Sequence, residues 1–209
     1  MARYNLLQSM MYEYLENLDF KPKKILDLGA WNGIWTREVK KFWPDAHYTC
    51  IEAGKKHEGR LLKCANQVFI AVLGNENKEV DLHLRKIKGH KITYTKGSNI
   101  FGLSTFPSQA VEKRKMQTLE SVVGADAIYD FIKQDIQGAE LLVMQGSPEI
   151  FKRATYVLNE VNLYKDPEQP LVPDVKEMDA YMKELGFNNS EIIADHPGHD
   201  QVDKIYWKN

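Results

Sequence analysis

The feature that most constrains this chain is a series of short apolar runs that each end in an acidic residue. "KKILDLGA" ends at Asp27 before a glycine, "HYTCIEA" at Glu52, "YDFIKQD" at Asp135, and "TYVLNEVN" at Glu160. Short apolar runs separated by helical patterns are typical of buried parallel strands. The carboxyl ends of such strands meet at one edge of an open α/β sheet, which is where these sheets bind ligands. The sequence therefore predicts an α/β fold with four carboxylates at one edge.

Helical patterns fill the stretches between these runs. Helices are expected over residues 1–20, in "GIWTREVKKFW", in "AELLVMQ" and in "PDVKEMDAYMKELGF". Another helix is expected to start at Pro148, with Ser147 as its N-cap. The alternation of strands and helices with short connections argues for a parallel sheet in a Rossmann-like, doubly wound arrangement. "EIIAD" and "KIYWK" are expected to close this sheet as a terminal pair.

The middle of the chain has a different pattern. "NQVFIAVLGN" predicts a third strand, after which "EVDLHLRKI" alternates apolar and polar residues. "KITYTK" follows a "KGH" turn, so the two segments predict an inserted β-hairpin. Residues 97–107 have turn residues and no period, which indicates a surface loop and a candidate lid. We predict one domain over residues 1–209, with the hairpin and loop insertion at 78–107.

The composition excludes several classes of function. The formal net charge of −1 over 209 residues gives no steering toward nucleic acid or anionic membranes. We interpret the basic clusters at Lys21–Lys24 and Glu112–Lys115 as solvated faces. Cys50 and Cys64 lack the spacing of metal ligands. Without a signal peptide or a long apolar run, the chain is expected to be cytoplasmic.

The histidines of "DHPGHD" invite a metal interpretation, but their spacing is not that of a helical pair. Because Pro197 and Gly198 lie between them, we interpret His196 and His199 as parts of a solvated turn. We therefore predict no metal site. A histidine base that reaches a substrate from this turn stays an open alternative.

The stretch "LDLGAWNGIW" indicates the kind of cofactor. Asp27, Gly29 and Gly33 form D-x-G-x-x-x-G at a strand-to-helix turn, although an acid with two turn glycines also occurs in other α/β proteins. Dinucleotide binders need G-x-G-x-x-G so that the backbone can approach a pyrophosphate, and the bulky Trp31 suits that contact poorly. S-adenosylmethionine has no phosphate and carries a sulfonium, so an edge rich in carboxylates suits it better. Glu52, at the end of the next strand, is placed to bind both hydroxyls of a ribose.

The sequence also resembles a known family. "ILDLGAWNGIWT", "YTCIEA", "AVLGN", "MQTLESVV", "FIKQDIQGAELLVMQG" and "VLNEVN" are similar to segments of the FkbM-type S-adenosylmethionine-dependent methyltransferases. The resemblance covers about Lys24 to Asn162. It implies a seven-stranded doubly wound sheet and methylation of a hydroxyl oxygen, often on sugars or secondary metabolites. The chain departs from the family at Gln137, where the family core usually has a glutamate.

The resemblance also implies roles for particular residues. The loop from Asp27 to Gly33 would shape the methionine side of the site, Glu52 would hold the ribose, and Ala71 and Val72 would flank the adenine. Asp135 would stand near the amino group and the transferred methyl. The predicted cofactor-binding residues are Asp27, Gly29, Ala30, Trp31, Gly33, Glu52, Ala53, Ala71, Val72, Asp135 and Ile136.

Asp135 and Glu160 are the candidate catalytic residues, because a carboxylate near the acceptor can receive its proton. The alternative for Asp135 is a cap of the turn before Ala139, and the alternative for Glu160 is a salt bridge to a basic residue near the sheet edge.

Three functions stay open at this point. The leading hypothesis is an O-methyltransferase that acts on a small-molecule or glycan hydroxyl. The second is an RNA ribose 2'-O-methyltransferase. Such enzymes arrange two lysines, an aspartate and a glutamate around the ribose, and in this chain Asp135 and Glu160 could supply only the two acids. The third is a module that binds the cofactor without turnover, which only Gln137 supports.

Overall fold

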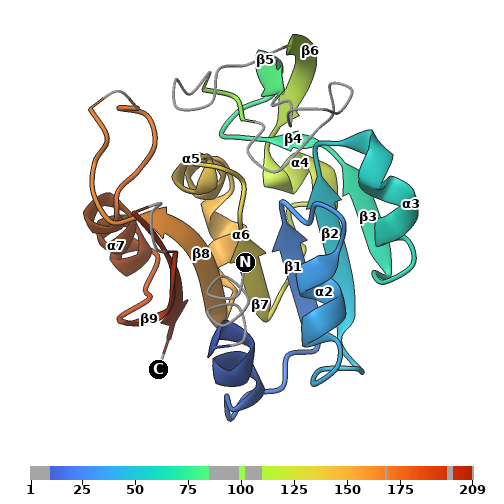
Figure 1. The fold of residues 1–209 in the computed structure, drawn as a ribbon, viewed down its shortest axis with the longest axis vertical. Coiled ribbons are helices and arrows are strands. Elements are labelled where there is room, and N and C mark those ends of the chain that lie inside the picture. The colour runs from blue at the N-terminus through green and yellow to red at the C-terminus, as the bar shows by residue number, and fades with distance from the viewer. Residues whose placement is uncertain (1–9, 85–98, 102–109, 168, 197–199, 209) are drawn as a thin grey trace.

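The computed structural model describes residues 10–84, 99–101, 110–167, 169–196 and 200–208. Its main feature is a seven-stranded sheet with the order β3-β2-β1-β7-β8-β10-β9 (Figure 1). The first five strands in this order are parallel, and β10 and β9 are antiparallel to their neighbours. The strands are β1 (Lys24–Leu28), β2 (His47–Glu52), β3 (Gln67–Ile70), β7 (Phe131–Gln134), β8 (Tyr156–Asn162), β9 (Asn189–His196) and β10 (Gln201–Trp207). The seven-stranded sheet and its terminal antiparallel pair confirm the sequence prediction.

Helices cover both faces of this sheet, as the doubly wound arrangement requires. One face packs against the helical residues 10–16 and against α2, through a cluster that includes Leu15, Trp35 and Phe131. The other face packs against α5, α6 and α7, through a cluster that includes Met144 and Met178. The helices are α2 (Ile34–Val39), the 3₁₀ turn η1 (Lys55–His57), α3 (Glu58–Leu61), α4 (Leu119–Val123), α5 (Glu140–Gly146), α6 (Pro148–Lys152) and α7 (Val175–Glu184).

A second, three-stranded sheet lies beyond one end of the main sheet (Figure 1). It consists of β4 (Val72–Leu73), β6 (Ala110–Gln117) and β5 (Lys78–Leu84), in that order. The predicted third strand is therefore divided: after β3 the chain leaves the main sheet at Ala71, and β4 pairs with β6. A prediction from apolar character alone cannot detect this change of sheet, because both parts are apolar.

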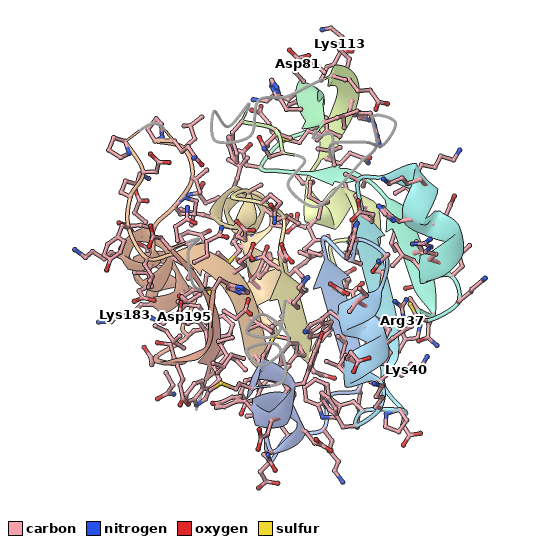
Figure 2. All side chains as sticks on the ribbon, viewed as in Figure 1. Arg37, Lys40, Asp81, Lys113, Lys183 and Asp195 are labelled. Atoms are coloured by element: carbon pink, nitrogen blue, oxygen red, sulfur yellow. The ribbon has the colours of Figure 1, made fainter. Side chains whose placement is uncertain are left out.

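The predicted hairpin is confirmed only in its first strand. β5 forms as expected, but its antiparallel partner among the described residues is β6, which the sequence analysis did not predict. The proposed second arm, "KITYTK", and most of the candidate lid lie outside the described residues. β6 contains the charged run from Glu112 to Lys115. Glutamate and lysine have a low strand propensity, so the sequence pattern does not predict a strand there. Lys113 does extend into solvent at the tip of this sheet, opposite Asp81 in the strand register (Figure 2).

Local signals set several helix boundaries. Asp174 caps α7 in a capping box with Glu177, and Gly186 follows the helix in a left-handed conformation. Ser147 does stand at the N-cap position of α6, but its hydroxyl accepts the backbone N–H of Glu120 instead of capping that helix. Within the described parts of the chain, no helix is both long and apolar enough to cross a bilayer.

Candidate active site

The loop between β1 and α2 is shaped by two glycines. Gly29 and Gly33 both have a positive φ, of 76° and 77°, which a residue with a Cβ rarely adopts. At Gly29 an added Cβ would lie 1.9 Å from the carbonyl oxygen of Asp135, so the loop and the end of β7 are in direct contact. The N–H groups of Gly29 and Ala30 both donate to Ile51, which joins the loop to β2 as well.

Trp31 is the most exposed part of this loop. Its backbone has a φ of 47° and its side chain is 38% exposed, an unusual combination for a large aromatic residue. Its ring lies edge-on to His57, and burial lowers the pKa of that histidine to about 4. Trp35, four residues further along, is a packing residue, because it is buried and stacks on Phe131. Trp31 instead lies at the open side of the loop.

Glu52 is held at the end of β2 by the backbone. One carboxylate oxygen accepts the N–H of Trp31 and the other accepts the N–H of Gly54, each at 2.8 Å. Each oxygen keeps a second lone pair, so the carboxylate can still accept two hydroxyl groups. Burial raises the pKa of Glu52, whereas these two N–H donors act in the opposite direction. The remaining predicted residues of this side adjoin it: Ala53 follows it, the N–H of Ala71 donates to its carbonyl, and Val72 is buried in β4.

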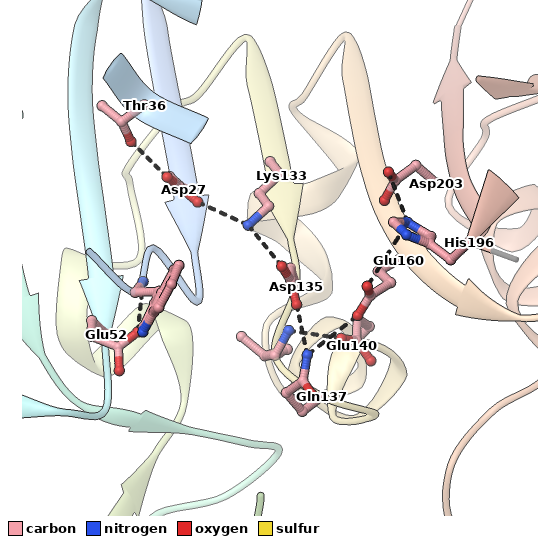
Figure 3. A network of polar contacts seen from close by, with 12 residues as sticks. Asp27, Thr36, Glu52, Lys133, Asp135, Gln137, Glu140, Glu160, His196 and Asp203 are labelled. Atoms are coloured by element: carbon pink, nitrogen blue, oxygen red, sulfur yellow. Dashed lines mark hydrogen bonds and ion pairs between the residues drawn. The ribbon is translucent and has the colours of Figure 1, made fainter. Parts of the chain in front are cut away.

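A buried lysine that the sequence analysis missed connects two of the predicted acids. Asp27 and Lys133 are directly opposite each other in the β1–β7 register. The ammonium lies 3.3 Å from Asp27 and 3.5 Å from Asp135, so it bridges the two carboxylates (Figure 3). Burial alone would lower the pKa of Lys133, but the carboxylates of Asp27, Asp135 and Glu160 raise it above its ordinary value. Lys133 is therefore a permanent cation.

Asp27 lies behind this edge instead of at its surface. Its side chain is 0% exposed, and it accepts the hydroxyl of Thr36 at 2.6 Å as well as pairing with Lys133. It therefore supports Lys133 and cannot touch a ligand without a rearrangement. The side chain of Asp135, in contrast, is 27% exposed. Thus Asp135 faces outward from the same ion cluster.

Gln137 joins the two candidate catalytic carboxylates. Its amide nitrogen donates to Asp135 at 2.9 Å and to Glu160 at 3.3 Å. The backbone of Gln137 is left-handed, with a φ of 59°, which points the side chain back toward the strand ends. A glutamate at this position could not donate to either neighbour unless it were protonated. The departure from the family sequence is therefore a structural link between Asp135 and Glu160.

The turn that carries Asp135 is fixed by Glu140, the first residue of α5. Its carboxylate accepts the N–H of Ile136 at 2.8 Å, and its side chain is almost fully buried. Burial raises the pKa of Glu140 to about 7, and the nearby charge of Asp135 acts in the same direction. A carboxylate does hold this turn, as the sequence suggested, but Glu140 supplies it.

Glu160 contacts a histidine that the sequence analysis placed in a solvated turn. His196 is the last residue of β9, and its side chain is only 10% exposed, so that interpretation is wrong for His196. Its Nε2 atom lies 3.1 Å from Asp203 and 4.0 Å from Glu160. The alternative of a salt bridge for Glu160 is thus met by His196 when its ring is protonated. Residues 197–199, which include His199, lie outside the described residues.

These contacts form one chain of polar side chains along the edge of the sheet (Figure 3). It crosses β1, β7, β8, β10 and β9, and each member lies within 4.0 Å of the next. Glu52 lies at the same edge, and the charges of Asp27 and Lys133 act on its carboxyl. No set of three or more acidic, histidine or cysteine side chains in the described part of the chain is arranged to hold a metal ion. The members of the chain are Thr36, Asp27, Lys133, Asp135, Gln137, Glu160, His196 and Asp203.

Comparison with known proteins identifies a family and a fold. A family model described as the methyltransferase FkbM domain matches residues 27–188. A search of curated protein sequences gives no match.

Solved structures with a similar fold are also methyltransferases by their titles. One is a putative caffeoyl-CoA O-methyltransferase from Staphylococcus aureus, with a TM-score of 0.51, 16% identity and coverage of 99% of this chain and 83% of the other. Another is a precorrin-6y C5,15-methyltransferase from Geobacter metallireducens, with a TM-score of 0.51, 11% identity and coverage of 97% and 87%. A third is the plantazolicin methyltransferase BpumL, with a TM-score of 0.50, 14% identity and coverage of 98% and 83%. At these identities the likeness shows a shared fold.

Proposed function

The chain belongs to the methyltransferase FkbM domain family, and we propose that it uses S-adenosylmethionine to methylate a hydroxyl oxygen of a small molecule or sugar. The family match covers most of the chain, from Asp27 in β1 through α7, so it includes Asp27, Glu52, Asp135 and Glu160 but not Asp203. The family implies S-adenosylmethionine as methyl donor. The oxygen acceptor and the roles of individual residues are our proposal.

The donor groups at the edge fit S-adenosylmethionine. This molecule carries a ribose, a sulfonium and an ammonium group, and the edge offers carboxylates and loop backbone. Glu52 is held with one free lone pair on each oxygen, which suits two ribose hydroxyls. The side-chain oxygen of Asn32, in the glycine loop, is buried without a hydrogen-bond partner among the described residues, so it is available to an N–H or O–H donor. Asp135 is placed for the ammonium group, next to the loop that Gly29 holds against it.

When bound, the cofactor supplies an activated methyl group, so the protein's main task is alignment. Positioning two reactants can be worth about 7–11 kcal/mol of the barrier. Asp135, fixed by Lys133 and Gln137, orients the amino-acid end. Glu160 lies one strand further along the edge and receives the proton of the acceptor hydroxyl, a role typically worth about 10²–10⁴-fold.

The observation that supports this proposal most is the pairing of a backbone-held carboxylate with an ion cluster at one sheet edge. Glu52 accepts two N–H groups, and Asp135 pairs with a permanently charged lysine, so both remain ready to bind cationic or hydroxyl groups. A dinucleotide would bring phosphate charges into this acidic edge, which would be unfavourable. The site thus favours a cationic ligand.

Calorimetry with S-adenosylmethionine and with NAD tests the cofactor site. We expect the first to bind and the second not to, and we expect Glu52→Ala to weaken binding about 10- to 100-fold through the loss of two charged hydrogen bonds. Glu149→Ala is the matched control, because Glu149 is exposed on α6, where its carboxylate pairs with Lys152. Binding of NAD to the unchanged protein would overturn the assignment. Methyl transfer to alcohols, followed with a labelled methyl group, then tests the acceptor class.

The RNA alternative gains one residue from the structure. Lys133 joins Asp135 and Glu160, which are an aspartate and a glutamate of the expected kind. However, Lys133 is buried and also pairs with Asp27, so it is poorly placed to face a ribose. Strong binding to RNA that falls steeply with salt would favour this alternative over the small-molecule acceptor.

A further inference from the structure

We propose that His196, held by Asp203, is a positioning residue that keeps Glu160 ionised and ready to take the acceptor proton. The inference rests on the proposed function, because Glu160 is the proton acceptor only if a hydroxyl is methylated. It assigns a role to two residues of β9 and β10, the antiparallel end of the sheet, and it separates the tasks of the two central carboxylates.

The sheet register brings these three side chains together. Glu160 on β8 is directly opposite Asp203 on β10, so their side chains leave the same face of the sheet. Asp203 is in turn opposite Ala194 on β9, and His196 lies two residues further along that strand, on the same face as Ala194. The imidazole therefore fits between two carboxylates, at 3.1 Å from one and 4.0 Å from the other (Figure 3). Both carboxylates favour the charged imidazolium form.

Three neutral or basic groups contact the carboxylates of Asp135 and Glu160. Gln137 donates to one oxygen of Asp135 and to one oxygen of Glu160. The other oxygen of Asp135 faces the permanent charge of Lys133, whereas the other oxygen of Glu160 faces His196. Asp135 is thus tied to an ammonium group, and Glu160 to an imidazole, a group whose unperturbed pKa lies near neutral pH. This asymmetry singles out Glu160 as the proton acceptor.

Glu160 benefits from such a partner because burial and two nearby carboxylates oppose its charge. Its side chain is only 8% exposed, and Asp135 and Asp203 bring two more negative charges close to it. Burial and like charges both favour the protonated carboxyl, which could not accept a proton. Tyr12 of the helical residues 10–16 faces the same cluster, since Lys133, Asp27 and Asp203 act on its hydroxyl, and it adds no positive charge. His196 and Lys133 supply the positive charges that offset this.

Methyl transfer to the acceptor forms one bond and breaks another at the same carbon. The acceptor oxygen forms a bond to the methyl carbon while the bond from sulfur to that carbon breaks, and its electron pair stays on sulfur. The hydroxyl proton passes to the Glu160 carboxylate. Glu160 then returns this proton to water, and the nearby imidazolium favours that return because it stabilises the carboxylate form. No oxidant or further reactant is needed.

Two measurements test the role of His196. In the first, the ring of His196 is titrated by NMR in the protein without ligand, with His196→Gln used to assign its signal. The ring should lose its proton at a pH about one unit lower in Glu160→Gln, because one of its two carboxylate partners is gone. A titration of His196 that is unchanged by this substitution would overturn the inference, whether or not the protein methylates anything.

The second measurement is the pH profile of methyl transfer. At about pH 6.5, His196→Gln should be about tenfold slower than the unchanged protein and should recover as the pH rises, because Glu160 then ionises without help. The affinity for S-adenosylmethionine should be unchanged. An equal loss at every pH would show a merely structural role and would overturn the inference. His47→Gln, at the opposite end of β2 from the site, is the control and should leave the profile unchanged.

The two proposals fail in different ways. If S-adenosylmethionine does not bind, or if no hydroxyl is methylated, the proposed function is wrong and the proton-acceptor role falls with it. If the cofactor binds and a hydroxyl is methylated, but the pH profile of His196→Gln runs parallel to that of the unchanged protein, only the role of His196 is wrong.

Discussion

The two halves of the sheet edge are built in different ways. At β1 and β2 the backbone makes the site: two glycines with positive φ shape the loop, and two N–H groups hold Glu52. At β7 to β10 side chains hold one another, through Lys133, Gln137 and His196. The shape of the first half is set by backbone conformation and backbone hydrogen bonds. The shape of the second half depends on which of its side chains are ionised. The geometry thus suits a constant ligand at one half and a proton transfer at the other.

The largest effect is expected at Gly29, where the two halves meet. An alanine there would place its Cβ 1.9 Å from the carbonyl oxygen of Asp135, in a backbone conformation that alanine disfavours. Neither strand end can move freely, so Gly29→Ala should destabilise the fold by about 4 kcal/mol or more, as exceptional substitutions do. Urea unfolding measures this loss.

Gly59→Ala is the matched control for Gly29. Gly59 lies in α3 and an added Cβ would meet nothing within 4 Å. This variant should be as stable as the unchanged protein or more stable by about 0.5–1 kcal/mol, because alanine favours a helix. Equal stability of the two variants would contradict the close contact between the loop and β7.

The backbone-built half could be predicted from the sequence because its signals are local. Asp27, Gly29 and Gly33 are neighbours in the chain, and a glycine pattern at a strand end specifies the turn directly. Apolar runs likewise predicted the seven strands of the main sheet, and their alternation with helices predicted the parallel order. The edge that gathers Glu52, Asp135 and Glu160 follows from that order alone.

The half built from side chains could not be predicted because it depends on strand register. Lys133 reads as an ordinary charged residue within an apolar strand until the register places it opposite Asp27. His196 reads as part of a turn until β9 is seen to extend to it and to bring it beside Glu160. Gln137 appeared only as a departure from a family pattern. One sequence without register therefore reveals which acids line the edge but not what holds them.

Lys133→Met removes the cation at the centre of the half that is built from side chains. The methionine fills a similar volume but leaves the fully buried Asp27 carboxylate without its cation. Removing one partner of a buried ion pair typically costs about 3–5 kcal/mol, and we expect a loss at the lower end of this range at neutral pH. Urea unfolding at neutral pH measures this loss.

A second substitution shows whether the loss comes from the unpaired charge. Asp27→Asn added to Lys133→Met should restore part of the stability, because the amide needs no cation. Lys115→Met is the control for the chemical change alone, since Lys115 is exposed on β6, and it should alter stability by less than about 0.5 kcal/mol. If the double variant is as unstable as both single losses added together, the two side chains do not depend on each other.

The smallest of these effects is expected at Glu140, which fixes the turn that both halves share. Its pKa is raised, mainly by burial, from 4.5 to about 7. The folded protein therefore binds this proton more tightly than the unfolded chain does. The stability that Glu140 contributes is fully present below about pH 4.5 and is lost as the pH rises through about 7, with a total change on the order of 2–3 kcal/mol. Glu140→Gln should remove this dependence because its side chain does not ionise.

The measurement is urea unfolding of the unchanged protein and of Glu140→Gln at about pH 5 and about pH 8, where the difference between the two proteins isolates one group. The unchanged protein should lose more stability between these pH values than the variant does. Glu184→Gln, at an exposed position of α7, should follow the unchanged protein instead. If the stability of Glu140→Gln changes with pH as that of the unchanged protein does, then ionising the buried carboxyl of Glu140 costs no folding free energy. In that case the conformation of the turn that carries Asp135 would be independent of pH, and the pH response of the site would come from its other ionisable groups, such as Glu160 and His196.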